Sequence, residues 1–239
     1  MEIKPFKKIK RLAIIPARGD SKRIPKKNIK DFHGKPIILY PLQVLHESNL
    51  FDKIHVSSDD QDIISVVEDY GLKVDFIRPE YLSDDFTPIM PVLKYVVEEY
   101  RKRKEFYDEV WVVFPCSPFL RTEYLIKASN KMISSKKSNF LMSVTEYPVP
   151  IEWAFRLDKN KLLQPLNQGS FAIRSQDIEK KYYDMGMFYA YSNERIINSE
   201  LKGIDENIIP YFIPMGNSVD IDEIEDWEHA ENLYKLNNY

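Results

Sequence analysis

A cluster of basic side chains directly follows the first apolar run of the chain. Residues 12–15 form the kind of short apolar run that becomes a buried strand. The next segment, residues 18–28, holds five Lys or Arg residues and one acid, Asp20, in a chain whose net charge is only −3. Gly19 and Ser21 keep the turn small, so backbone N–H groups can approach a ligand. This order suits polyphosphate binding, although a solvated basic loop would show the same charges.

Two aspartates near the end of the chain have the spacing of a divalent-cation site. Asp220 and Asp222 stand two residues apart, and in an extended segment such side chains share a face. Their carboxylates could converge on Mg²⁺, which prefers oxygen ligands. Asp222 could instead cap the helix expected next, because Glu225 follows it as in a capping box. Capping does not account for Asp220.

Further polar groups fall where predicted strands end, which is where open parallel sheets bind ligands. One group is residues 57–60, in which Ser58 or Asp59 could also cap the following helix. Arg78 closes a strand predicted at residues 74–77. Residues 84–88 form an acidic turn that contains Thr87 and precedes another helix.

The elements that must position these groups alternate between strand and helix patterns. Strands are predicted at residues 12–15, 54–56, 74–77, 110–114, 140–145 and 187–191. Helices are predicted near residues 38–45, 63–70, 91–101, 124–132 and 224–236, the second ending at Gly71. This order indicates an α/β fold with a mainly parallel, doubly wound sheet.

The length of 239 residues suits one domain spanning residues 1–239. The alternation breaks at residues 147–183, where Pro148, Pro150 and Pro165 interrupt short apolar pieces. We interpret this region as an inserted arm. Its Trp153 and Phe155 suit a subunit contact, or packing within the arm itself.

Composition excludes several classes of partner. The small net charge gives no case for binding nucleic acid or a membrane surface, and no apolar run reaches the ~18 residues that span a bilayer. The basic start of the chain lacks the apolar core of a signal peptide, and Cys116 has no second cysteine to pair with. These features favour the cytoplasm. The four histidines do not have metal-ligand spacing.

The segment LAIIPARGDSKRIPKKNI, residues 12–29, resembles the nucleotide-binding signature of the CMP-sugar synthetases, the cytidylyltransferases that activate acidic nine-carbon sugars. The resemblance extends from about residue 12 through the final helix. It implies a Rossmann-like nucleotidyltransferase fold and a homodimer formed through the inserted arm. Asp20 departs from the family, most of which has a second glycine there, and its carboxylate would repel phosphates.

The resemblance also implies roles for individual residues. Nucleotide binding is expected of Ala17, Arg18, Gly19, Ser21, Lys22, Asn28, Arg78 and Thr87. Catalytic roles are expected of Arg18, Lys22, Asp220 and Asp222, the two aspartates acting as ligands of Mg²⁺, the expected cofactor. Sugar binding is expected of Phe114, Arg174 and Gln176.

Phe114 bears on the choice of sugar. Sialic-acid synthetases usually have a sugar-contacting Gln at this point, whereas the chain has Phe114. The segments DDFTP and RSQDIEKKYYDMGMFY are closer to the branch that acts on pseudaminic acid, a dideoxy sugar with a methyl group. We therefore expect CTP and pseudaminic acid as substrates and pyrophosphate as a product. The alternatives are N-acetylneuraminic, legionaminic or 3-deoxy-octulosonic acid as the sugar, or a non-catalytic nucleotide-binding module, which Asp20 favours.

Overall fold

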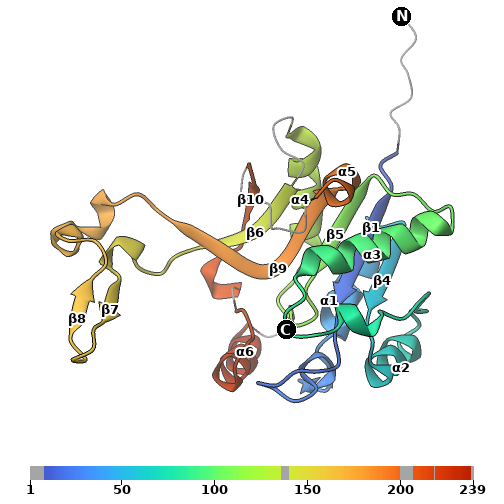
Figure 1. The fold of residues 1–239 in the computed structure, drawn as a ribbon, viewed down its shortest axis with the longest axis horizontal. Coiled ribbons are helices and arrows are strands. Elements are labelled where there is room, and N and C mark those ends of the chain that lie inside the picture. The colour runs from blue at the N-terminus through green and yellow to red at the C-terminus, as the bar shows by residue number, and fades with distance from the viewer. Residues whose placement is uncertain (1–7, 136–139, 200–206, 218, 238–239) are drawn as a thin grey trace, which may run out of the picture.

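A six-stranded sheet in the order β10-β6-β9-β5-β1-β4 forms the centre of the protein (Figure 1). The computed structural model describes residues 8–135, 140–199, 207–217 and 219–237; most of the basic N-terminal segment lies outside these residues. The strands are β1 (Arg11–Pro16), β4 (Lys53–Ser57), β5 (Glu109–Val113), β6 (Phe140–Glu146), β9 (Tyr182–Ser192) and β10 (Ile209–Phe212). β9 is antiparallel to β5 and β6, and the other pairs are parallel. The predicted mainly parallel sheet is confirmed.

Helices cover both faces of this sheet (Figure 1). Ala13 and Ile15 of β1 share one core with α1, α2, α4 and α6, while Leu12 and Ile14 share the opposite core with α3 and α5. All four side chains are fully buried, which explains the continuous apolar run in the sequence. The helices are α1 (Leu39–Ser48), α2 (Gln61–Asp69), α3 (Ile89–Lys102), α4 (Thr122–Ser134), α5 (Asn193–Ile197) and α6 (Ile224–Leu236). Within the described ranges, no helix has both the length and the apolar character needed to cross a bilayer.

Helix α2 shows how local sequence sets an element boundary. Asp60 accepts hydrogen bonds from the N–H groups of Asp62 (2.7 Å) and Ile63 (3.2 Å), so the helix is capped one residue beyond the two predicted candidates. Gly71 ends the helix as predicted: its φ is +103°, and its N–H donates to the Glu68 carbonyl at 2.9 Å.

The strand predicted at residues 74–77 is wrong. The N–H of Arg78 donates to the Ser58 carbonyl at 2.8 Å, and that of Val74 donates to Glu68 Oε1 at 3.3 Å. These contacts do not repeat as a ladder, and β4 forms the edge of the sheet. The sequence pattern also missed α5, β10 and the hairpin of β2 (Asp31–Phe32) and β3 (Lys35–Pro36), which are too short to show a period.

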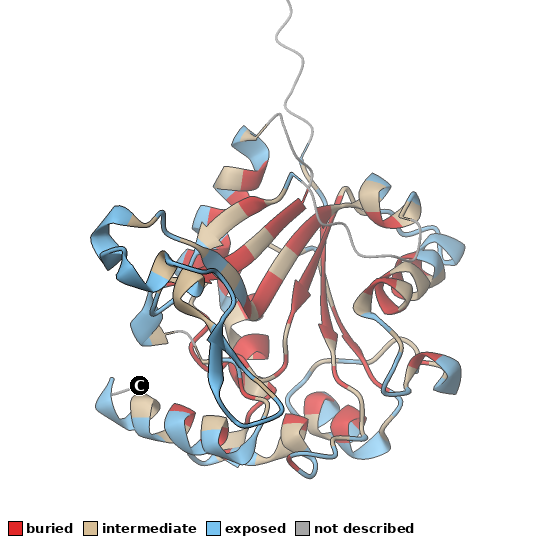
Figure 2. Ribbon diagram, turned by 60° about the vertical axis from the view of Figure 1, so that its left-hand side comes forward, coloured by how far each residue is buried: buried red, intermediate tan, exposed pale blue. Residues whose placement is uncertain are grey.

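The segment between β6 and β9 projects from the body as an arm (Figure 1). It carries the hairpin of β7 (Phe155–Leu157) and β8 (Leu163–Pro165). Inside the arm, Phe171 packs against Trp153 and Phe155, with ring centroids 5.9 and 5.5 Å apart. Most of the arm surface is nevertheless exposed (Figure 2). The large hydrophobic side chains exposed there are Tyr147, Val149, Ile151, Phe155, Leu157, Leu162, Leu163, Leu166, Phe171 and Ile173.

His55 on β4 is buried in a neutral form. Its ring stacks on Phe76 at 4.3 Å, and Nδ1 lies 3.1 Å from the hydroxyl of Tyr100, which donates to Asp75. Nε2 has no hydrogen-bond partner among the described residues. Burial lowers the pKa of His55 to about 3, because a proton on Nε2 would be a buried charge without a partner.

Mild acid is therefore expected to destabilise the fold through His55. In the unfolded chain the histidine pKa is about 6.5, so between pH 6.5 and 3 the unfolded state binds more protons than the folded state. The free energy of unfolding therefore decreases as the pH is lowered through this range. From pH 7 to pH 5 the wild type should lose about 2 kcal/mol relative to His55→Phe. Urea unfolding at both pH values measures this difference, and parallel pH profiles would contradict the prediction.

Candidate active site

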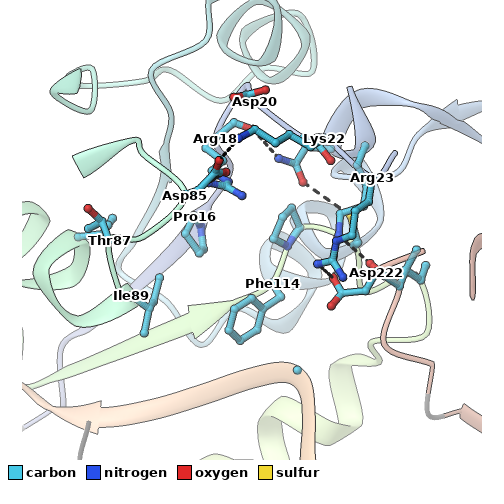
Figure 3. Close-up of a pocket in the computed structure, with 18 of the residues that line it drawn as sticks. Pro16, Arg18, Asp20, Lys22, Arg23, Asp85, Thr87, Ile89, Phe114 and Asp222 are labelled. Atoms are coloured by element: carbon cyan, nitrogen blue, oxygen red, sulfur yellow. Dashed lines mark hydrogen bonds and ion pairs between the residues drawn. The ribbon is translucent and has the colours of Figure 1, made fainter. Parts of the chain in front are cut away.

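A cavity of about 650 Å³ opens at the carboxyl ends of β1 and β5 (Figure 3). Figure 3 shows Arg18 and Lys22 beside Asp85 on one side, Arg23 beside Asp222 on another, and Phe114 between them and β9. The predicted site residues that line the cavity are Arg18, Ser21, Lys22, Asn28, Arg78, Thr87, Phe114, Asp220 and Asp222. The basic loop and the two aspartates thus meet, although they lie at opposite ends of the sequence.

Two cations of the basic loop converge on one acid. Arg18 Nη1 lies 2.6 Å from Asp85 Oδ1, and Lys22 Nζ contacts the other carboxylate oxygen. The hydrogen bond between Lys22 and Asp85 raises the pKa of Lys22 and lowers the pKa of Asp85. A phosphate group could replace this carboxylate, because it offers oxygen acceptors to the same two donors. Asp20 also lines the cavity.

Other residues of the loop hold its shape. Ala17 is fully buried and its N–H donates to the Ser57 carbonyl at 2.9 Å, so neither its side chain nor its N–H is offered to a ligand. Asn28 Nδ2 donates to the carbonyl of Arg18 at 2.9 Å, and Cys116 Sγ donates to Asn28 Oδ1 at 3.6 Å. Burial raises the pKa of Cys116 to about 12, which keeps it a thiol donor. Asn28 therefore fixes the backbone that carries Arg18.

Gly19 lies where the loop meets the start of α2. A Cβ on Gly19 would lie 2.3 Å from Asp60 Oδ2, and the Gly19 N–H donates to Asp59 Oδ1 at 3.3 Å. Gly19→Ala should displace Asp60 from its capping position and lower the free energy of unfolding by about 1 kcal/mol. Urea unfolding tests this, with Gly216→Ala as the control because a Cβ there meets nothing within 4 Å. Equal stability of the two variants would contradict the prediction.

Arg78 supplies a buried positive charge to the cavity. Its Nε donates to Ser57 Oγ at 3.1 Å and its Nη2 donates to the Ser57 carbonyl at 2.5 Å. Burial lowers the pKa of Arg78 to about 10, so the group is charged at neutral pH. Such a fixed donor suits the carbonyl or ring nitrogen of a nucleotide base. Thr87 lines the same cavity, and its N–H donates to Asp84 Oδ1 at 2.6 Å.

The capping role that the sequence allowed for Asp222 belongs to its neighbours. Asp226 Oδ2 accepts the N–H groups of Asp222 (3.0 Å) and Glu223 (2.8 Å), and Glu223 is the N-cap of α6. The carboxylate of Asp222 is therefore turned toward the basic loop. Its Oδ1 lies 3.2 Å from Lys27 Nζ and 3.1 Å from Arg23 Nη2.

The two aspartates differ electrostatically. The Asp220 side chain is exposed into the cavity, but the cavity walls remove part of its bulk water. This burial, and next the charge of Asp222, raise the pKa of Asp220. Burial alone would also raise the pKa of Asp222, but Lys27 and Arg23 outweigh it and lower that pKa.

Three residues that line the cavity were not among the predicted site residues: Arg23, Lys27 and Asp85. Arg23 and Lys27 belong to the basic loop, so their position in the sequence could have identified them. Nothing in the sequence pointed to the pairing of Asp85 with Lys22, which are 63 residues apart.

Arg174 and Gln176 lie on the arm and not in this cavity. Arg174 Nε pairs with Asp177 Oδ2 at 2.8 Å. Gln176 lines a small hollow between arm segments, together with Tyr147 and Lys181. The structure therefore does not bring these two predicted sugar-binding residues to Phe114 within one chain.

The doubly wound sheet, and the cavity that the basic loop and the two aspartates line at its carboxyl edge, are typical of a nucleotide-binding α/β protein. A family model described as Cytidylyltransferase matches residues 12–237. The chain belongs to this cytidylyltransferase family, and it is a cytidylyltransferase.

Two curated relatives and one solved structure illustrate the match. Pseudaminic acid cytidylyltransferase of Campylobacter jejuni subsp. jejuni serotype O:2 is 38% identical over 229 residues, covering 96% of this chain and 98% of the relative. CMP-N,N'-diacetyllegionaminic acid synthase of Legionella pneumophila is 29% identical and covers 95% and 97%. A CMP:2-keto-3-deoxy-manno-octonic acid synthetase complexed with CTP has a TM-score of 0.70 at 17% identity, covering 95% of this chain and 99% of that one. This last likeness shows the fold.

Proposed function

We propose that the enzyme joins CTP to an acidic nine-carbon sugar, pseudaminic acid foremost, to form the CMP-sugar and pyrophosphate. The observation that carries the proposal is the cavity, in which Arg18 and Lys22 face the same space as Asp220 and Asp222. The C. jejuni relative, whose name specifies pseudaminic acid, supports the choice of sugar.

The reaction requires one bond to form and one to break. The anomeric hydroxyl oxygen of the sugar attacks the α-phosphorus of CTP, and its proton passes to solvent. The bond from the α-phosphorus to the oxygen that bridges to the β-phosphate breaks, and pyrophosphate leaves. Arg18 and Lys22 release Asp85 and hold the charge that develops on the leaving group. Arg78 and Thr87 hold the nucleoside, and Asn28 keeps the backbone of Arg18 in place.

The acidic pair fits Mg²⁺ as its donor set. Mg²⁺ is usually bound by one or two carboxylates, with substrate phosphates and waters completing the shell. Asp220 and Asp222 offer two carboxylates to the cavity, and the contacts of Asp222 with Lys27 and Arg23 use only Oδ1. When bound, the ion neutralises charge on the phosphates. No group of three potential metal ligands occurs in the described part of the chain, which agrees with a shell that phosphate oxygens and waters complete.

Phe114 supports a sugar with an apolar substituent. It lines the cavity, and its ring lies edge-to-face against Tyr189, with centroids 5.1 Å apart. A ring at this place offers no hydrogen bond to a hydroxyl group but packs well against a methyl group. Pseudaminic acid carries a methyl group where sialic acid carries a hydroxyl group.

A homodimer through the arm accounts for two observations together. The arm exposes ten large hydrophobic side chains, which is typical of an interaction surface. Arg174 and Gln176 lie on this arm and do not line the cavity of their own chain. In a homodimer they would contact a sugar bound in the cavity of the partner subunit. Light scattering in solution measures the assembly, and a monomer at micromolar concentration would contradict it.

Pyrophosphate release is the test of the proposed reaction. CTP and Mg²⁺ are incubated with pseudaminic, legionaminic, N-acetylneuraminic and 3-deoxy-octulosonic acids in parallel. Release with pseudaminic acid alone is expected. Release with another of the sugars would keep the reaction and change the substrate. CTP binding without any release would favour the non-catalytic module, in which Asp20 in the cavity opposes a productive triphosphate.

A further inference from the structure

Strand β9 contains an irregularity at the cavity. Val144 of β6 pairs with Asp184, and Met142 of β6 pairs with Tyr189. The paired residues are two positions apart on β6 but five positions apart on β9, so β9 contains a bulge. Gly186 inside this bulge has a φ of +62°, which suits glycine. Buried Ser143 accepts hydrogen bonds from the N–H groups of residues 187 and 188 at 3.3 and 3.0 Å. The bulge is therefore a hydrogen-bonded feature of the fold.

The bulge brings together two side chains that a regular strand would separate. Residues five apart on a strand point to opposite faces and lie about 17 Å apart. Here the Tyr189 hydroxyl donates directly to Asp184 Oδ2, while Asp184 Oδ1 accepts the N–H of Gly186 at 2.9 Å. Both side chains line the cavity. A bulge that aims side chains in this way is common beside active sites.

The position of the pair in the sheet separates it from the nucleotide-binding residues. The basic loop follows β1, and Ser57, which holds Arg78, ends β4, whereas β9 lies on the far side of β5. Phe114 follows β5 and packs its ring against Tyr189. The β9 end of the cavity therefore faces the second substrate. Asp220 also lies at this end, because a Cβ on Gly186 would be 3.2 Å from its carboxylate oxygens.

The chemistry of the pair is that of an oriented acceptor. Burial, and next the Asp184 carboxylate, raise the pKa of Tyr189, so the phenol is a donor at neutral pH. It holds the carboxylate in one orientation. An ionised carboxylate only accepts hydrogen bonds, and its two oxygens have more acceptor sites than the contacts with Tyr189 and Gly186 use.

We propose that Asp184, oriented by Tyr189, is a specificity-determining residue that binds a hydroxyl or amide N–H group of the sugar. Asp184 selects a donor on the sugar, while Phe114 meets an apolar substituent. This inference rests on the proposed function, because it assigns one residue of the sugar subsite in that reaction.

Steady-state kinetics with separate titrations of sugar and CTP test the inference. The sugar is the one that the wild type turns over fastest. Asp184→Ala should raise the KM for the sugar at least about tenfold, the size of a lost hydrogen bond to a charged group, with the KM for CTP changed less than about twofold. Tyr189→Phe should act in the same direction by about threefold, because it removes only the orienting hydroxyl group. Asp69→Asn, an exposed residue at the end of α2, is the charge-matched control.

Asp184→Asn guards against a folding defect. It keeps the size of the side chain and an oxygen for Tyr189, and it should also raise the KM for the sugar at least about tenfold while CTP still raises its melting temperature. An unchanged sugar KM in Asp184→Asn, or an equal rise in the CTP KM, would overturn the inference and leave the proposed function intact. A wild type that is inactive with every sugar tested would overturn both.

Discussion

Replacing Asp220 with asparagine is expected to lower the rate of pyrophosphate release at saturating substrates by at least about 100-fold. The carboxylate lies at the β9 end of the cavity beside Asp222, and the amide removes the negative charge that a hard cation requires. The raised pKa of Asp220 adds a pH dependence: its charge, and with it Mg²⁺ binding, should be lost at a higher pH than for an ordinary aspartate. A Mg²⁺ titration of the rate at pH 7.5 and pH 5.5 measures both effects.

The matched control is Glu228→Gln on α6. This substitution removes one negative charge, as Asp220→Asn does, but at an exposed position in the helix that follows the two aspartates. Its Mg²⁺ titration should overlay that of the wild type. If Asp220→Asn kept more than about a tenth of the wild-type rate at every Mg²⁺ concentration, Asp220 would not be a metal ligand of this reaction.

Lys22→Ala is expected to lower kcat/KM for CTP by at least about tenfold while the fold is retained. The side chain is exposed, so its removal leaves no buried gap, but the cavity loses one of the two cations that converge on Asp85. Without Lys22, only Arg18 of this pair balances the Asp85 carboxylate, and the less balanced negative charge repels the triphosphate. Steady-state kinetics with CTP as the varied substrate give the value.

The same loop offers a matched control for Lys22. Lys26 has the same charge but pairs with Asp62 of α2 at 2.6 Å and does not line the cavity. Lys26→Ala should change kcat/KM less than about threefold. Equal effects of the two substitutions would mean that the overall charge of the loop matters, and not the position of Lys22.

Much of the fold follows from local patterns. The buried strands β1 and β5 were visible as apolar runs, and α2 and α3 as helical periodicity, because these signals depend on residues a few positions apart. The segment at residues 74–77 carried the same apolar signal but did not become a strand. A strand needs a repeating ladder of backbone hydrogen bonds to a partner, whereas the N–H of Val74 donates to the Glu68 side chain and that of Arg78 to the Ser58 carbonyl.

The sequence by itself determined the basic loop, the acidic pair and the order of elements that carries both to one edge of the sheet. The tertiary structure alone decided how these groups are paired. Asp85 holds Arg18 and Lys22 across the cavity, and Asp226 frees the Asp222 side chain from capping. The bulge at Gly186 joins Asp184 to Tyr189, and the arm carries Arg174 and Gln176, which do not line the cavity that Phe114 lines. Periodicity is a property of neighbours along the chain, whereas pairing depends on strand order, register and the direction of each segment, which are set only when the whole sheet packs.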